Sequence, residues 1–198
     1  MRVLGLDPGS RHFGWGVVAR EGTRLVHVEH GIIHTDERAP LALRLVTLEA
    51  ELAAVVARHR PACASVETLF FAKDARAAAT LGHARGVALL VCARASVETF
   101  EYAPTLVKRA VAGTGRAEKS QVAQMVRVVL GLAAAPVADA ADALAIALTH
   151  LQRLPLDEAR ARAEARLAAA RALLGSPRAP RPRSTAAAGR HIRRGKAV

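Results

Sequence analysis

The chain has 198 residues, of which 52% are hydrophobic and 23% charged, an ordinary composition for a soluble globular protein with one main core. Its formal net charge of +12 and its pI of about 11.3 indicate a polyanionic partner. The longest uncharged run, Val128 to Ala138, is far shorter than the roughly 18 apolar residues of a membrane-spanning helix, and the first residues resemble a strand rather than a signal peptide. We therefore expect a cytoplasmic protein without a membrane partner.

Residues 2–33 have the pattern of three strands. Arg2 to Asp7 predicts a buried strand that ends at the turn residues 8–10. Phe13 to Ala19 and Leu25 to Ile33 predict two more strands, which are joined near Gly22. We therefore expect an antiparallel meander.

Helical and strand patterns alternate through the rest of the domain. Apolar residues at helical spacing, with Pro and Gly between the segments, set the expected boundaries. In order, we expect a helix over Leu41 to Arg58, a strand over Ala62 to Val66 that ends on Glu67, a helix from about Asp74 to Arg94, a strand over Ser96 to Phe100, and helices over Pro104 to Ala112, Glu118 to Leu130 and Asp139 to Leu151. This order predicts an α/β fold with a mixed five-stranded β-sheet flanked by helices on both faces.

The positive charge is concentrated near the C-terminus. Residues 157–198 contain 11 Lys and Arg against 3 Asp and Glu, whereas residues 1–156 contain 18 against 14. Residues 157–174 are rich in Ala, Arg and Leu and suit a helix, while residues 175–198 lack the apolar content that would offset the entropy of ordering. We therefore expect a domain of residues 1–156, a helical segment and a disordered basic tail, which is either a binding arm or a solubilising extension.

Four acidic residues stand where distant parts of the chain are expected to meet. Singly, each has an ordinary explanation: Asp7 as a turn former, Glu67 as a solvated strand end, Asp139 as a helix N-cap and Asp142 as a first-turn acid. If the strands that end at Asp7 and Glu67 are neighbours, however, both side chains lie at one sheet edge. A helix across that edge then presents Asp139 and Asp142 on one face. Such carboxylates repel one another unless divalent cations lie between them.

This set of ligands predicts a metal-dependent nuclease. Oxygen ligands without His or Cys favour Mg²⁺ or Mn²⁺ over Zn²⁺. Two such ions, about 4 Å apart, would orient and deprotonate a water on one side of a phosphodiester and stabilise the leaving oxygen on the other. Lys119, at the start of an expected helix, is a candidate partner for the phosphate, and Lys108 is a second. Each lysine also has the simpler explanation of a solvated surface charge.

Five segments together resemble one known family. In chain order they are GLDPGSRHFGWGVV, SVETLFFAKD, ARGVAL, EYAPTLVKRAVAGTGRAEKSQV and ADAADALAIALTH, and they lie within residues 1–152. Their order and separations are similar to those of the RuvC family of Holliday junction resolvases. The resemblance implies a ribonuclease H-like fold, a homodimer, and paired, symmetric, Mg²⁺-dependent cleavage of four-way DNA junctions to 5′-phosphate and 3′-hydroxyl ends in recombination and repair. It also implies a junction-migrating helicase complex of the RuvA and RuvB type as a partner, and catalysis or DNA contact by Lys108 and Lys119.

Residues just after Glu67 are further candidates for DNA contact. Aromatic residues make up only 3% of the chain, yet Phe70 and Phe71 are adjacent. In an extended segment their side chains point in opposite directions, and Phe70 is the outward candidate. The resemblance implies that Phe70 stacks on an unpaired base at the junction centre; the alternative is that both rings belong to the core. Lys73, Arg76 and Arg85 are candidates for phosphate contact, although a solvated charge is the more common role.

Two symmetric nicks require two active sites, which a two-fold dimer provides. The helix expected from Asp74 to Arg94 is the candidate interface. The apolar stripe along it could equally pack on the sheet; it comprises Ala77, Leu81, Ala84, Ala88 and Val91.

Three other functions compete with the nuclease. Residues 113–120 nearly match the phosphate loop of an ATPase, but Glu118 stands at the glycine position, where its carboxylate would face the phosphates. Phosphotransferases and ATPases of the actin and sugar-kinase type share the opening strand and Asp-x-Gly, but 198 residues leave no room for their second domain. A non-catalytic junction-binding protein, with the carboxylates as helix and strand caps, would bind DNA without metal and would not cut it.

Overall fold

The computed structural model describes residues 1–68 and 75–154, all within one compact unit, Met1–Glu158. The strands are β1 (Arg2–Asp7), β2 (His12–Glu21), β3 (Arg24–His34), β4 (Cys63–Glu67) and β5 (Glu98–Tyr102). The helices are α1 (Leu41–His59), α2 (Ala75–Arg94), α3 (Pro104–Ala112) and α4 (Lys119–Leu130), and a further helix spans residues 138–154. The expected helical segment 157–174 and basic tail 175–198 lie outside the described residues.

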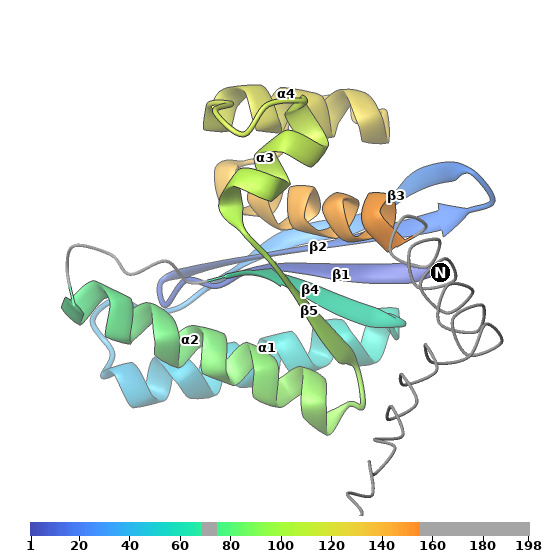
Figure 1. Ribbon diagram of the computed structural model, residues 1–198. Coiled ribbons are helices and arrows are strands. Elements are labelled where there is room, and N and C mark those ends of the chain that lie inside the picture. The colour runs from blue at the N-terminus through green and yellow to red at the C-terminus, as the bar shows by residue number, and fades with distance from the viewer. Residues whose placement is uncertain (69–74, 155–198) are drawn as a thin grey trace, which may run out of the picture. The chain divides into compact units, whose positions relative to one another are not determined.

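The five strands form one sheet in the order β3-β2-β1-β4-β5 (Figure 1). β1, β2 and β3 are antiparallel neighbours, whereas β1, β4 and β5 run parallel. β1 is therefore central, and its register places Leu6 opposite Val66 of β4. The predicted mixed five-stranded sheet is confirmed, and the last residues of β1 and β4 lie at the same edge.

Helices cover both faces of the sheet, as predicted. α1 and α2 lie on one face, while α3, α4 and helix 138–154 lie on the other (Figure 1). Each face has its own apolar core: α1 and α2 pack on one through Leu48, Leu52, Ala84, Ala88 and Val91, and the second contains Val107, Val122, Val126, Leu144 and Leu148. None of the helices in the described ranges combines the length and apolarity needed to cross a membrane.

Helix 138–154 lies unusually close to the central strands. A Cβ atom on Gly5 of β1 would overlap the carbonyl oxygen of Ala143, and one on Gly14 of β2 would overlap the carbonyl oxygen of Asp139. Since only glycine lacks this atom, these two residues permit direct contact between the backbones of helix and sheet. The inner face of the helix is correspondingly lined with alanine.

Two expectations differ from the structure. The last strand is Glu98–Tyr102, not Ser96 to Phe100, because residues 95–97 close the end of α2: Ser96 has a φ of 56°, and the Val97 N–H donates to the Cys92 carbonyl at 2.9 Å. Three members of the apolar stripe proposed for dimer contact are buried in the core of their own chain: Ala84, Ala88 and Val91. These three residues therefore pack in the core, as the alternative expected, whereas Ala77 is exposed and Leu81 is half-buried.

Candidate active site

Two of the predicted carboxylates come from neighbouring parallel strands. Asp7 is the last residue of β1, and Glu67 is the last residue of β4. Both side chains are half-buried. Because the two strands run parallel and in register, their ends present both carboxylates at the same edge of the sheet.

The other two carboxylates come from helix 138–154. Its first turn begins where the Ala141 N–H donates to the Val137 carbonyl at 2.8 Å. Asp139 and Asp142 are three residues apart, so they lie on one face, and both are half-buried. The close contact of the Asp139 backbone with Gly14 holds this turn against β2, next to the end of β1.

The four acidic groups influence one another electrostatically. Burial, followed by the charges of Asp142, Glu67 and Asp139, raises the pKa of Asp7 from 3.8 to about 7, while Lys119 lowers it. The pKa of Glu67 is also raised, by burial first and by Asp142 second. The structure therefore brings the four carboxylates together, and their mutual repulsion calls for a cation.

Lys119 supplies one such cation. This residue begins α4, and its Nζ lies 2.8 Å from Oδ2 of Asp142. The hydrogen bond and charge of Asp142 raise the pKa of Lys119, so the ammonium is firmly protonated. A pocket of about 80 Å³ adjoins the pair and is lined by Glu67, Pro104, Val107, Lys108, Lys119, Val122, Asp142 and Ile146. Lys108 lowers the pKa of Glu67 and is thus the second cation at this site.

The four acidic side chains are the ligand type that hard divalent cations prefer, but their positions do not form a complete metal site. All four are carboxylates, the ligand type of Mg²⁺ and Mn²⁺. Among the described residues, no three His, Cys, Asp or Glu side chains form a group that would hold a metal ion as they stand. Oδ2 of Asp142 is instead paired with Lys119, so coordination through this oxygen requires the ion pair to open.

A capping box engages backbone donors at the start of α4. The Glu118 carboxylate accepts the Gln121 backbone N–H, and the Gln121 side chain accepts the Glu118 N–H at 2.9 Å. This capping box uses helix donors that a phosphate loop would offer to a nucleotide, and it adds a negative charge there. The structure thus disfavours the ATPase interpretation of residues 113–120.

The remaining predicted residues are less informative. Phe70 and Lys73 lie outside the described residues. Arg76 belongs to α2, but its side chain is not described. Arg85 of the same helix is wrong as a candidate for phosphate contact, because its side chain is buried and pairs with Glu101 at 2.6 Å. Sequence analysis missed Gly5 and Gly14, which let the helix carrying two carboxylates reach the sheet. Glycines on two paired strands indicate that a helix packs closely on the sheet only when the position of that helix is known.

Comparison with known proteins identifies the family. The model of the family described as crossover junction endodeoxyribonuclease RuvC matches residues 3–150. The chain belongs to the RuvC family. The crossover junction endodeoxyribonuclease RuvC of Sorangium cellulosum is 62% identical over 151 residues, which cover 76% of this chain and 84% of that protein. The protein of the same name from Myxococcus xanthus is 53% identical over 153 residues, 76% of this chain and 80% of that one.

Solved RuvC structures share the fold. Thermus thermophilus RuvC is 39% identical with a TM-score of 0.73, and the match covers 79% of this chain and 97% of that chain. T. thermophilus RuvC in complex with Holliday junction substrate is 40% identical with a TM-score of 0.72, over 76% and 93% of the two chains. The yeast mitochondrial Holliday junction resolvase Ydc2, 12% identical with a TM-score of 0.51, shares the fold alone. The predicted ribonuclease H-like fold is thereby confirmed, and the ATPase, phosphotransferase and non-catalytic alternatives are not favoured.

Proposed function

We propose that this member of the RuvC family resolves four-way DNA junctions by hydrolysing phosphodiester bonds in two symmetric strands. The observation that carries this proposal is the meeting of Asp7, Glu67, Asp139 and Asp142, where burial together with the three neighbouring carboxylates raises the pKa of Asp7 to about 7. Roles as helix or strand caps would not require the four carboxylates to lie close enough to repel one another. The family relationship supports the same conclusion.

The four carboxylates are the proposed ligands of two Mg²⁺ ions, for which Mn²⁺ substitutes. When bound, the ions supply Lewis-acid activation of water and stabilisation of the leaving oxygen. The protein's own contribution is to fix the ligands on rigid elements: Asp7 and Glu67 on two paired strands, and Asp139 and Asp142 on the helix packed against them. Cleavage is expected to leave 5′-phosphate and 3′-hydroxyl ends.

Lys119 is the proposed catalytic cation for the phosphate. Its side chain is 73% exposed although it pairs with Asp142, so DNA has access to it. Exchange of the Asp142 carboxylate for a phosphate oxygen would keep the ammonium partnered while freeing a metal ligand. Lys108 lines the same pocket, and we assign it to DNA contact.

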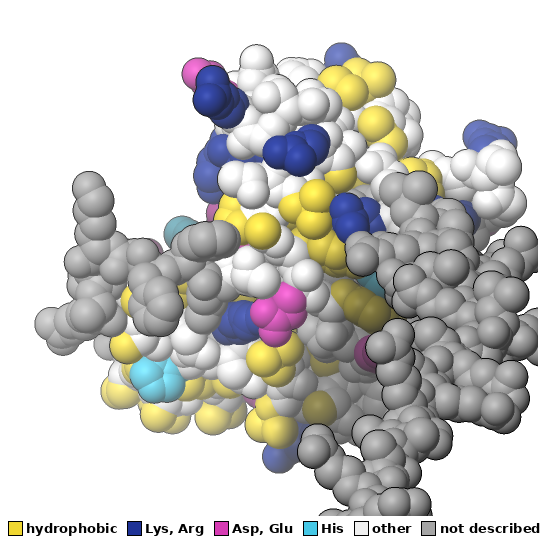
Figure 2. All heavy atoms as spheres, viewed as in Figure 1, with side chains coloured by type: hydrophobic (Ala, Val, Ile, Leu, Met, Phe, Trp, Pro, Cys, Tyr) yellow, Lys and Arg dark blue, Asp and Glu magenta, His cyan; other side chains and the backbone are white. Residues whose placement is uncertain are grey.

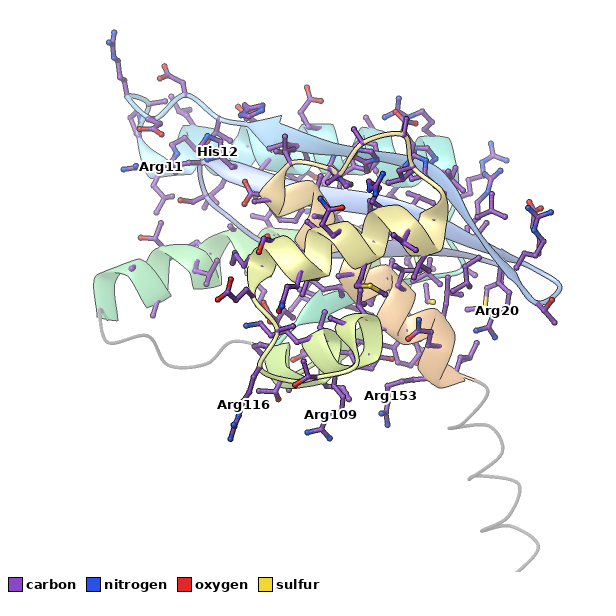
Figure 3. All side chains as sticks on the ribbon, turned by 90° about the horizontal axis from the view of Figure 1, so that it is seen from above. Arg11, His12, Arg20, Arg109, Arg116 and Arg153 are labelled. Carbon is purple, nitrogen blue, oxygen red and sulfur yellow. The ribbon has the colours of Figure 1, made fainter. Side chains whose placement is uncertain are left out.

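The face that carries these lysines is a suitable surface for DNA. Figure 2 shows Lys and Arg side chains gathered over the part of the surface formed by α3 and α4. In Figure 3, Arg109, Arg116 and Arg153 point outward along one edge of the molecule. Phosphate contacts of this kind give affinity and orientation without reading sequence. We assign Lys73 and Arg76 to the same role, with Phe70 stacking on a base at the junction centre and the basic residues 175–198 adding phosphate affinity to the nuclease domain of residues 1–156.

A homodimer through α2 would supply the second active site. The outward face of this helix carries Gly82 and Gly86, whose missing side chains face open space, followed by Leu90, which is 47% exposed. Such a smooth face with one large apolar residue permits close helix-to-helix contact between two copies. Because junctions form on chromosomal DNA, we also propose that the protein acts in the cytoplasm beside a junction-migrating complex of the RuvA and RuvB type.

Cleavage of a labelled four-way junction tests this function. The junction and a duplex of the same sequence are incubated with the protein in Mg²⁺, in Mn²⁺ or in EDTA, and junction binding is measured separately in EDTA. Asp7→Asn is compared with Asp36→Asn, a matched change of an exposed carboxylate whose Oδ1 only accepts the Arg38 N–H at 2.9 Å.

Paired nicks that require a divalent ion, occur in the junction alone and vanish in Asp7→Asn but not in Asp36→Asn would support the proposal. Junction binding without cutting in either metal would overturn the catalytic assignment.

A further inference from the structure

The loop that follows Asp7 is held from outside by an arginine of another element. Residues 8–11 connect Asp7, at the end of β1, to His12, at the start of β2. Only Pro8 and Gly9 separate Ser10 of this loop from Asp7, so the position of the loop bears on the end of β1. Figure 3 labels Arg11 and His12, which mark the far end of the loop.

Arg44 of α1 donates hydrogen bonds to Ser10 of this loop. Its Nε donates to the Ser10 carbonyl oxygen at 3.1 Å, and its Nη2 donates to the same oxygen and to Ser10 Oγ, the latter at 2.7 Å. The planar guanidinium thus engages both the backbone and the side chain of a single loop residue. A lysine has one point of charge and no such fork of donors.

Thr35 forms hydrogen bonds with both Ser10 and Arg44. Its hydroxyl donates to the Ser10 carbonyl at 2.7 Å and accepts from Arg44 Nε at 3.2 Å. Its backbone N–H donates to the Arg11 carbonyl at 3.0 Å. Three separate segments, namely the loop, the residue after β3 and the second turn of α1, therefore meet in one half-buried network.

The network lies outside the core that anchors α1. The buried residues of this helix are Leu48, Leu52, Val55, Val56 and His59, all of which come after Arg44. Loss of the Arg44 contacts would therefore leave the packing of α1 on the sheet in place. What it would release is the loop, whose Ser10 is three residues from Asp7.

We propose that Arg44 is a positioning residue for the proposed nuclease: by holding Ser10 against Thr35, it fixes the loop that begins at Asp7 and hence the orientation of the Asp7 carboxylate. This inference rests on the proposed function. Residues that do not bind the metal but hold its ligands in position typically contribute 10- to 100-fold to metal affinity or activity. We expect a loss of roughly tenfold for Arg44→Lys and up to about a hundredfold for Arg44→Ala.

The test compares Arg44→Lys with Arg58→Lys, a matched change on the same helix, where Arg58 forms only an exposed pair with Glu29 at 3.4 Å and a ring contact with Trp15. Thr35→Val removes the hydroxyl of the network, and Thr35→Ser retains it. Four quantities are measured in the full-length protein: hydrogen exchange of the peptide covering residues 7–12, Mn²⁺ binding, and kcat and KM for a four-way junction.

The proposal predicts faster exchange in this peptide, about tenfold weaker Mn²⁺ binding and about tenfold lower kcat at unchanged KM for Arg44→Lys. Thr35→Val should act in the same direction, whereas Thr35→Ser and Arg58→Lys should match the wild type. Unchanged exchange, or faster exchange with unchanged Mn²⁺ binding and kcat, would overturn it. If the wild-type protein cuts no junction, the proposed function fails, and the exchange and Mn²⁺ measurements still decide the role of Arg44.

Discussion

Replacing Asp7 by Asn should make the metal-free protein more stable while abolishing cleavage. The raised pKa means that the folded state holds the Asp7 proton more tightly than the unfolded state does. Well below pH 3.8 the Asp7 carboxyl is protonated in both the folded and the unfolded state, so it does not change the free energy of unfolding. As the pH rises from 3.8 to about 7, ionisation costs the folded state an increasing free energy, and above pH 7 the whole cost applies. A shift of this size corresponds to about 4 kcal/mol at most, and to about 2 kcal/mol at pH 5.

Urea unfolding at pH 5 and pH 8 in EDTA measures this effect. Asparagine cannot ionise, so we expect Asp7→Asn to exceed the wild type in free energy of unfolding, by more at pH 8 than at pH 5. Added Mg²⁺ should then stabilise the wild type more than the variant, because a bound ion favours the folded state. Asp36→Asn should show neither effect. An Asp7→Asn protein no more stable than the wild type at pH 8 would refute the view that burial and the neighbouring carboxylates disfavour ionised Asp7.

Three further predictions concern the framework of the site. Gly14→Ala should push the Asp139 backbone away from β2 and lower cleavage at least tenfold while junction binding persists, as gel shift and cleavage assays would show; equal cleavage would contradict the close contact. Leu90→Glu should convert the proposed dimer into a monomer in sedimentation equilibrium, and an unchanged mass would exclude this face of α2. Tyr102→Phe should cost about 1–2 kcal/mol in urea unfolding, since its hydroxyl lies 2.7 Å from Nδ1 of buried His150; no loss would show that this contact is dispensable.

The sequence predicts the sheet and the meeting of its acids well because both follow from local patterns. Asp7 and Glu67 end strands whose apolar runs are easily recognised, and the parallel pairing of β1 with β4 brings them to one edge. Asp139 and Asp142 lie at the start of a long apolar helix. In each case the periodicity of a single segment contains the information.

What the sequence could not predict depends on contacts between segments. The shift of β5 to Glu98–Tyr102 arises from hydrogen bonds that close α2, and the pattern of residues 96–100 alone does not reveal them. The apolar stripe of α2 is equally consistent with a core or an interface until the sheet is in place. The pairing of Arg44 with Ser10 joins residues 34 positions apart, with no periodicity to indicate it.

The contact between helix 138–154 and the sheet has a consequence for how the protein tolerates change. Backbone atoms meet directly at Gly5 and Gly14, and a backbone has no rotamers through which to readjust. Substitutions elsewhere in the same apolar core, for example at Val122 or Val126, can therefore alter the free energy of unfolding while the two helix carboxylates keep their distance from β1. In this chain, global stability and the geometry of the site therefore depend on different contacts.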